Sequence, residues 1–208
     1  MVFLDSFDTF AEPLVRYFLG IFFLMIGLQF SARSLGLHAR MGFSFINYGR
    51  KASAGWWHRH IFNVFRALIL AVVVARVFAE IDPWLGVFGF MYHGPVLVTG
   101  AVLLMLSFSL VNYLQAYMHD DWRSGVDPKQ NRHLLTGGPY SRSRNPVFIA
   151  VMLGQLGFFL ALPSVFSLVC LLAGVTVLMR QARVEEKALA ELFGDAYEAY
   201  RRRVPRWL

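Results

Sequence analysis

The stretch at residues 94–117, GPVLVTGAVLLMLSFSLVNYLQAY, decides the fold class, because it is mostly apolar and holds no charged residue. A helix that crosses the hydrocarbon core of a membrane needs about 20 such residues. This stretch therefore predicts a membrane-spanning helix. Four more segments meet or approach the required length, at residues 13–30, 61–79, 146–162 and 164–179.

The composition of the whole chain agrees with a membrane protein. Of its 208 residues, 57% are hydrophobic and 16% are charged, whereas soluble domains carry about 25% charged residues. The mean hydropathy is +0.50. These values exclude secreted, collagenous and disordered classes of protein. We expect an all-α fold, a polytopic membrane bundle of about five transmembrane helices whose last two spans meet in a tight hairpin at Pro163-Ser164.

The positions of the basic residues predict the orientation of these spans. The connections at residues 31–60, 118–145 and 181–208 hold sixteen Lys and Arg residues, while residues 1–12, 80–93 and 163 hold none. Basic connections stay in the cytoplasm. The pattern predicts a multi-pass integral membrane protein with its N-terminus outside and its C-terminus cytoplasmic. It also indicates that the basic residues behind the net charge of +7 face membrane lipids, and it predicts no nucleic-acid partner.

A few polar residues lie within or beside the spans. Arg66 and Arg76 fall near opposite ends of one span, where we expect their side chains to reach the lipid headgroups. His58-x-His60 lies in a basic interfacial segment, residues 31–60, without a neighbouring acid or cysteine. That pattern does not predict a zinc site, and no metal site is predicted elsewhere. Cys170 is expected to be a small core residue.

Polar chemistry concentrates first in the connection at residues 118–145. Gly137-Gly138-Pro139 permits a sharp turn, and Asn145-Pro146 has the form of a helix cap followed by proline at the first helical position. A helix that starts here offers free N–H groups and a positive dipole end to a carboxylate or phosphate. The alternative is that Asn145 only caps the helix.

The second polar place is the cytoplasmic tail. No proline occurs between Ser164 and Gly194, so the last span is expected to continue as a helix of about 30 residues, roughly 45 Å long. Glu185 and Glu186 would then stand just past the membrane edge, level with the glycine turn. Adjacent carboxylates require hydrogen bonds or cations, and Arg183 is the expected cation. A solvated run of charges is the alternative.

The C-terminal half resembles a known family. The chain carries Leu134-Leu-Thr-Gly-Gly-Pro-Tyr140, then Arg144-Asn145-Pro146-Val147-Phe148, then Glu185-Glu186, and finally Val204-Pro205. In this order these motifs resemble the isoprenylcysteine carboxyl methyltransferase and phospholipid methyltransferase family of integral membrane methyltransferases, over about residues 94–207. The resemblance implies a methyltransferase-like core with a cytoplasmic tail at 94–208, preceded by variable N-terminal spans and the basic loop at 1–93.

The resemblance also implies the reaction and its site. We expect methyl transfer from S-adenosylmethionine to a lipophilic acceptor, with no covalent catalytic residue. Asn145 and Phe148 stand where the family motif has histidine and tyrosine. The residues implied in cofactor binding are Arg132, His133, Leu134, Leu135, Tyr140, Asn145, Pro146, Val147, Phe148, Glu185 and Glu186.

The acceptor side of the site is less defined by the resemblance. A family arginine that is associated with substrate falls at Gln181 in this chain, and Arg180 and Arg183 flank it, so these two arginines are the expected substrate residues. A carboxylate or thiolate acceptor needs no general base. An amine acceptor needs one, for which Glu185, Glu186 and Asp120 are the local candidates.

Two other functions compete with methyl transfer. One is a sterol-reductase-like membrane enzyme that binds NADPH, because the C-terminal half of such enzymes resembles the same pattern. The other is a non-catalytic membrane scaffold or transporter. The pair Glu185-Glu186 favours methyl transfer over the reductase, and the absence of acidic residues within the predicted spans disfavours a proton-coupled transporter.

Overall fold

The computed structural model describes residues 2–41, 51, 53–118 and 133–208, and this part of the chain is built from helices. The elements are α1 (Val2–Met41), α2 (Ala54–Phe78), α3 (Asp82–Leu85), α4 (Gly94–Met118), the 3₁₀ turn η2 (Gly138–Ser141), α5 (Pro146–Ala161), α6 (Val165–Phe193) and α7 (Asp195–Arg203).

Helices are found at all five predicted spans. Four helices are long and apolar enough to cross a membrane, with candidate spans at Asp8–Gln29, Trp56–Phe78, Gly94–Met118 and Val165–Phe193. The fifth, α5, is shorter, at 16 residues or about 24 Å, and it meets α6 through Pro163 and Ser164. The all-α, polytopic fold class predicted from the sequence is confirmed.

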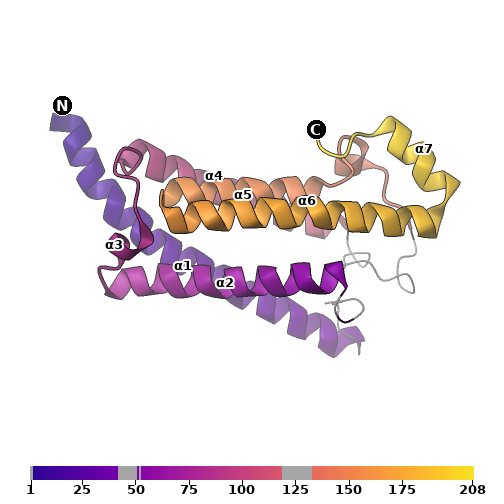
Figure 1. Cartoon of the computed structure of the whole chain (residues 1–208), viewed down its shortest axis with the longest axis horizontal. Helices are drawn as coiled ribbons and strands as arrows, with labels where there is room; N and C mark the ends of the chain where they lie inside the picture. Colours follow the sequence, from indigo (N-terminus) through magenta and orange to yellow (C-terminus); the bar gives the residue numbers. More distant parts are fainter. Residues whose placement is uncertain (1, 42–50, 52, 119–132) are drawn as a thin grey trace.

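The helix α6 is also as long as the sequence predicts. It runs for 29 residues from Val165 to Phe193, which is about 43 Å at 1.5 Å a residue. Because the hydrocarbon core of a bilayer is about 30 Å thick, the C-terminal part of α6 extends past the other spans. Figure 1 shows this extension reaching α7, beyond the ends of α4 and α5.

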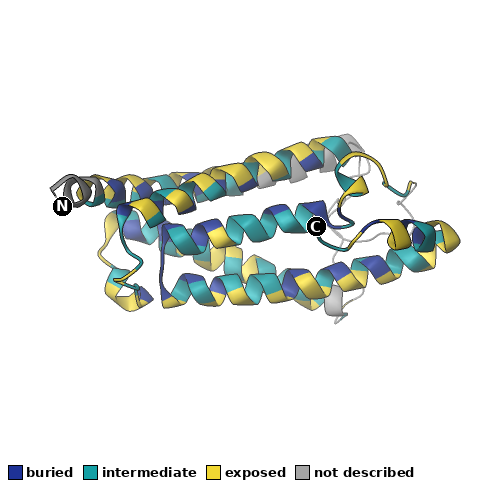
Figure 2. Cartoon of the chain, turned by 90° about the horizontal axis from the view of Figure 1, so that it is seen from above, coloured by how far each residue is buried: buried dark blue, intermediate teal, exposed yellow. Residues whose placement is uncertain are grey.

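The spans form a bundle with apolar sides facing outward. In Figure 1, α4, α5 and α6 run side by side, α2 lies along them, and α1 crosses the bundle obliquely. Exposed positions recur along the outer faces of these helices (Figure 2), and many carry large apolar side chains, such as Leu68, Leu106 and Val169. A lipid environment suits such faces, because apolar side chains that face lipid are not exposed to water.

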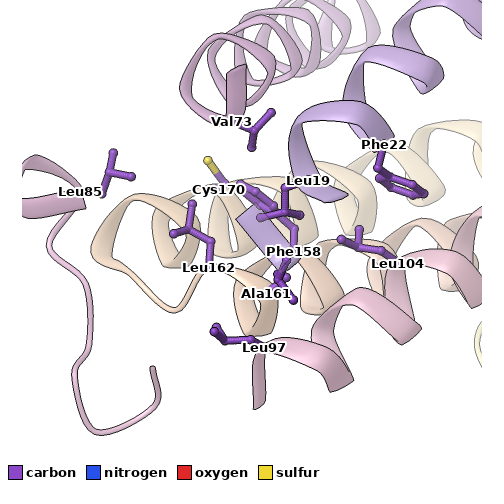
Figure 3. Close-up of a cluster of buried hydrophobic side chains, with 11 residues drawn as sticks. Leu19, Phe22, Val73, Leu85, Leu97, Leu104, Phe158, Ala161, Leu162 and Cys170 are labelled. Carbon is purple, nitrogen blue, oxygen red and sulfur yellow. The ribbon is translucent and has the colours of Figure 1, made fainter. Parts of the chain in front are cut away.

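The core lies where five helices converge. Buried side chains from each helix meet in one cluster (Figure 3). They include Leu19 and Phe22 of α1, Val73 of α2, Leu97 and Leu104 of α4, Phe158 and Ala161 of α5, and Cys170 of α6. The interpretation of Cys170 as a core residue is confirmed.

The bundle end opposite η2 and α7 is held by a network of ion pairs. Arg76 of α2 is 2% exposed, and its Nε and Nη2 donate to Asp82 at 2.6 and 2.9 Å. Arg16 of α1 donates to the same carboxylate at 2.8 Å and to Glu12 at 2.7 Å, and Arg76 Nη2 donates to the hydroxyl of Tyr92 at 2.9 Å. The prediction that Arg76 reaches lipid headgroups is therefore wrong.

This network also sets the charge of its central acid. Burial alone raises the pKa of Asp82, but the hydrogen bond and charge of Arg76, together with the charge of Arg16, lower that pKa below its ordinary value. A buried guanidinium needs such a partner. The sequence pattern missed the pair because Asp82 follows the span and pairs only after the chain turns back at α3.

Candidate functional site

The glycine turn η2 packs against the end of α4, and we call Tyr117, Gly138 and Tyr140 together the platform. Gly138 has φ +55°, and a Cβ at this position would lie 2.7 Å from the ring of Tyr117, so the turn requires glycine. The Tyr117 ring stacks on Tyr140, with centroids 6.4 Å apart, and the Tyr140 hydroxyl bonds to Met118 Sδ at 3.1 Å. Two residues at the end of α4 thereby hold Tyr140 in place.

Glu186 is the centre of a second set of contacts at the same end of the bundle. Its side chain is 8% exposed. Arg206 donates to both carboxylate oxygens, from Nε at 2.8 Å and from Nη2 at 2.9 Å. Arg144 Nη1 lies 3.1 Å from Oε2, and Asn145 Nδ2 donates to Oε1 at 2.9 Å. Glu186 therefore joins α6 to the start of α5 and to the C-terminal tail.

These contacts correct two predictions from the sequence. The partners of Glu186 are Arg144 and Arg206, whereas Arg183 is exposed on α6. Asn145 does occupy the cap position of α5, but its side chain makes no capping hydrogen bond and donates to Glu186 instead. The alternative of a solvated charge run is also wrong for Glu186, because this side chain is buried and paired.

The C-terminal segment closes over this region. Arg144 N–H donates to the carbonyl of Pro205 at 3.0 Å, and Ser143 Oγ donates to the carbonyl of Arg206 at 3.1 Å. The apolar side of α7 packs nearby: Tyr197, Tyr200 and Val204 form a buried cluster with Leu134, Leu189, Ala190 and Phe193. The tail is thus part of the site's framework.

Tyr200 links the α7 cluster to the platform. Its hydroxyl donates to the carbonyl of Tyr140 at 2.7 Å. Burial, and then the neighbouring Tyr197, raise the pKa of Tyr200 to about 12. Burial also raises the pKa of Tyr140 well above its usual range, and the negative charge of Glu185 adds to the effect. Both phenols are therefore neutral hydrogen-bonding groups at physiological pH.

Glu185 lies on a different face of α6 and contacts a different part of the chain. Its Oε1 accepts a hydrogen bond from Gln181 Nε2 at 3.0 Å, and the charge of Arg59 acts on its carboxylate. Gln181 Oε1 in turn lies 3.0 Å from His58 Nδ1. The first turns of α2 therefore belong to the site, which the sequence did not indicate.

The other predicted residues occupy varied positions. Arg132 and Asp120 lie outside the described residues. His133 is exposed, Leu134 packs in the α7 cluster, and Leu135, Val147 and Phe148 are partly buried. Pro146 is buried at the start of α5, while Arg180 and Arg183 are both exposed on α6.

Arg144 carries a buried donor atom that faces no acceptor among the described residues. Arg144 Nε is buried and has no hydrogen-bond partner, although the Nη1 atom of the same side chain faces Glu186 and donates to the Tyr197 hydroxyl at 3.4 Å. An unpaired donor of this kind suits an acceptor oxygen such as a carboxylate. Acceptor oxygens on Glu185 and the aromatic ring of Tyr140 complete a mixed set of polar and apolar groups.

Comparisons with known proteins identify a family and a relative that this chain resembles. Residues 88–196 match the phospholipid methyltransferase family. The cobalt-zinc-cadmium resistance protein CzcN of Cupriavidus metallidurans is 30% identical over 149 residues, which cover 71% of this chain and 62% of that protein. The chain thus spans somewhat less than two thirds of this relative's length. No solved structure matches the chain.

Proposed function

The chain belongs to the phospholipid methyltransferase family, and from this premise we propose that it transfers a methyl group from S-adenosylmethionine to a lipophilic acceptor at the cytoplasmic surface of the membrane. When bound, S-adenosylmethionine supplies a methyl group on a positively charged sulfur. Direct displacement at such a carbon depends on positioning and on exclusion of water. The chain therefore needs no covalent catalytic residue.

The observation that carries the proposal is the meeting of Glu185, Tyr140 and the start of α5 at one end of the bundle. A carboxylate such as Glu185 accepts hydrogen bonds from ribose hydroxyls. The unpaired Nε of Arg144 and the helix start at Pro146 suit the carboxylate of the amino-acid part. An aromatic face such as Tyr140 favours a nearby sulfonium cation.

The proposed cofactor residues extend along the same segments. Glu186 acts by fixing Arg144 and Asn145 through the contacts described above. The full proposed set is Arg132, His133, Leu134, Leu135, Tyr140, Asn145, Pro146, Val147, Phe148, Glu185 and Glu186. We also propose that residues 94–208 form the methyltransferase core and that residues 1–93 supply the variable spans and the basic loop.

The proposed acceptor reaches the site from the lipid. The bundle presents apolar faces to its surroundings, and the proposed cofactor residues adjoin the ends of those spans. A soluble enzyme would suffice for a polar acceptor. Arg180 and Arg183 are exposed on α6 where it leaves the span, and we propose that they hold an acidic group on the acceptor or on neighbouring lipids.

Replacing Glu185 with glutamine tests the cofactor assignment. A hydrogen bond to a charged group contributes about 1.5–3 kcal/mol, so we expect Glu185→Gln to weaken S-adenosylmethionine binding by about ten- to hundredfold while the protein stays folded. Equilibrium dialysis of radiolabelled S-adenosylmethionine against the detergent-purified protein measures this affinity.

Glu191→Gln is the matched control, because Glu191 lies on the same helix and its side chain is 69% exposed. We expect its affinity for S-adenosylmethionine to equal that of the wild type. If Glu185→Gln binds S-adenosylmethionine as tightly as the wild type, Glu185 does not contact the cofactor. Binding of NADPH in place of S-adenosylmethionine by the wild type would favour the reductase-like alternative.

The cytoplasmic location of the site is tested by cysteine labelling. In intact cells we expect an impermeant maleimide to label Phe90→Cys, in the connection between α3 and α4, because this position is 80% exposed and predicted to lie outside. Arg202→Cys, on the exposed side of α7, should be labelled only after the membrane is permeabilised. The reverse pattern would invert the proposed orientation.

A further inference from the structure

His58 belongs to a chain of polar contacts that ends at Glu185. Its Nδ1 lies 3.0 Å from Gln181 Oε1, and Gln181 Nε2 donates to Glu185 Oε1 at 3.0 Å. Gln181 and Glu185 share one face of α6, four residues apart. The amide of Gln181 thus connects the first turns of α2 to the carboxylate of Glu185, whose negative charge raises the pKa of Tyr140.

The amide of Gln181 determines which group donates and which accepts in each of these two hydrogen bonds. One end of an amide side chain only donates hydrogen bonds and the other only accepts them. Because the NH₂ end faces the carboxylate of Glu185, the carbonyl end faces His58. The Nδ1 atom of His58 must then carry the proton, and in the neutral imidazole the lone pair lies on Nε2. His58 is thereby held in the tautomer that can accept a proton at Nε2.

These donor and acceptor roles require that Glu185 is ionised. Burial raises the pKa of Glu185 above its ordinary value, and the hydrogen bond from Gln181 and the charge of Arg59 offset part of this rise by favouring the carboxylate. A neutral Glu185 would donate to Gln181, which would reverse the amide and move the His58 proton to Nε2. The tautomer of His58 therefore reports which arrangement the protein adopts.

We propose that His58 is the proton acceptor of this site, positioned by Gln181 and Glu185, and that it serves an acceptor substrate whose reacting atom must lose a proton, such as an amine. This inference rests on the proposed function. Glu186 is a poor candidate for the same role, because Arg206 occupies both of its oxygens.

The proton and electron movements balance for an alkylammonium acceptor. An ammonium nitrogen has no lone pair, so one N–H bond breaks first and its proton moves to His58 Nε2. The freed lone pair then forms the bond to the methyl carbon, and the electron pair of the broken carbon–sulfur bond stays on the sulfur. The imidazolium of His58 later returns its proton to water.

The tautomer is measured without any turnover. Nitrogen-15 NMR of the full chain labelled at histidine, in detergent, distinguishes the two tautomers by their ring-nitrogen shifts, and His58→Gln identifies the signals of His58. We expect the Nδ1–H form in the wild type and a shift towards the Nε2–H form in Gln181→Leu. An Nε2–H form in the wild type would overturn the inference.

Activity provides the second measurement. With phosphatidylethanolamine vesicles as the amine acceptor, we expect His58→Gln to lower the rate about hundredfold, within the usual effect of a general base, while affinity for S-adenosylmethionine changes less than twofold. His60→Gln is the matched control in the same turn, where the His60 ring packs 3.9 Å from Trp56, and it should keep the wild-type rate.

The outcomes separate the inference from the proposed function. A wild-type protein that binds no S-adenosylmethionine defeats the proposed function whatever the tautomer is. A protein that binds it, yet methylates the amine equally fast in His58→Gln, defeats only the role of His58. Methylation of the carboxylate of N-acetyl-S-farnesylcysteine and not of the amine would also overturn the inference, because that acceptor needs no base.

Discussion

Replacing Glu186 with alanine should lower the free energy of unfolding by about 3 kcal/mol, because the change leaves charged groups buried without their partner. The Arg144 side chain is 9% exposed, so water cannot replace the lost carboxylate there. Arg206 is 37% exposed and recovers part of its hydration. Heat denaturation in detergent should show a fall in melting temperature of roughly 10 °C.

The same substitution should also release the C-terminal segment. Glu186 joins α6 to Asn145 and to Arg206, so its loss should expose the tail to proteases before the bundle unfolds. Mass spectrometry of limited digests would locate the first cuts. First cuts elsewhere than after Arg201, Arg202, Arg203 or Arg206 would contradict this account.

Two further variants isolate the contribution of the ion pairs. Glu191→Ala removes an exposed carboxylate 3.9 Å from Lys187 on the same helix, and such pairs contribute at most about 1 kcal/mol. Adding Arg206→Ala to Glu186→Ala should cost less than the sum of the two single changes, because it removes one unpaired charge. Strict additivity would mean that the pairing of these residues contributes nothing to stability.

The spans were predictable because their signal is local. The apolar run of α4 and the absence of proline from Ser164 to Gly194 correctly predicted long helices. Gly138 was correctly predicted to lie in a turn, since its φ of +55° is a property of the local backbone. The length of α1, Val2–Met41, exceeds the predicted span at residues 13–30, because residues on both sides of the apolar run also form helix.

The pairings between segments were not predictable in the same way. Arg183 is close to Glu186 in sequence, yet its side of α6 is exposed, while Arg206 arrives after α7 reverses the chain direction. His58 pairs with Gln181 across 123 residues. Which face of a helix meets another depends on the rotation of both helices in the bundle, and hydrophobic runs that are apolar all round do not reveal that rotation.

Replacing Gly100 with alanine should separate α4 from α5 and destabilise the protein by about 3 kcal/mol or more, since overpacking a close contact forces the backbone to move. A Cβ at Gly100 would lie 2.6 Å from the carbonyl oxygen of Gly157 and would also collide with the backbone nitrogen of Ala161. Backbone atoms cannot rotate aside as a side chain can. The small residues at this crossing therefore set the distance between the helices.

Gly27→Ala in α1 is the matched control, because its new Cβ would make an ordinary contact 4.0 Å from Leu70. We expect this variant to keep wild-type stability in detergent, within about 1 kcal/mol. Gly157→Ala also brings a Cβ against backbone, 2.8 Å from Leu104 N. Once Gly100→Ala has separated the helices, Gly157→Ala should add less than it costs alone.

The effect should reach the site, although Gly100 lies near the other end of α4. Tyr117 at the end of α4 stacks on Tyr140, and α5 begins at Pro146 beside Asn145, so separating the two helices moves both sides of the platform. We expect Gly100→Ala to weaken S-adenosylmethionine binding below the melting transition as well as to lower the melting temperature. Wild-type stability in Gly100→Ala, with Gly27→Ala unchanged, would show that α4 and α5 do not cross at this glycine pair.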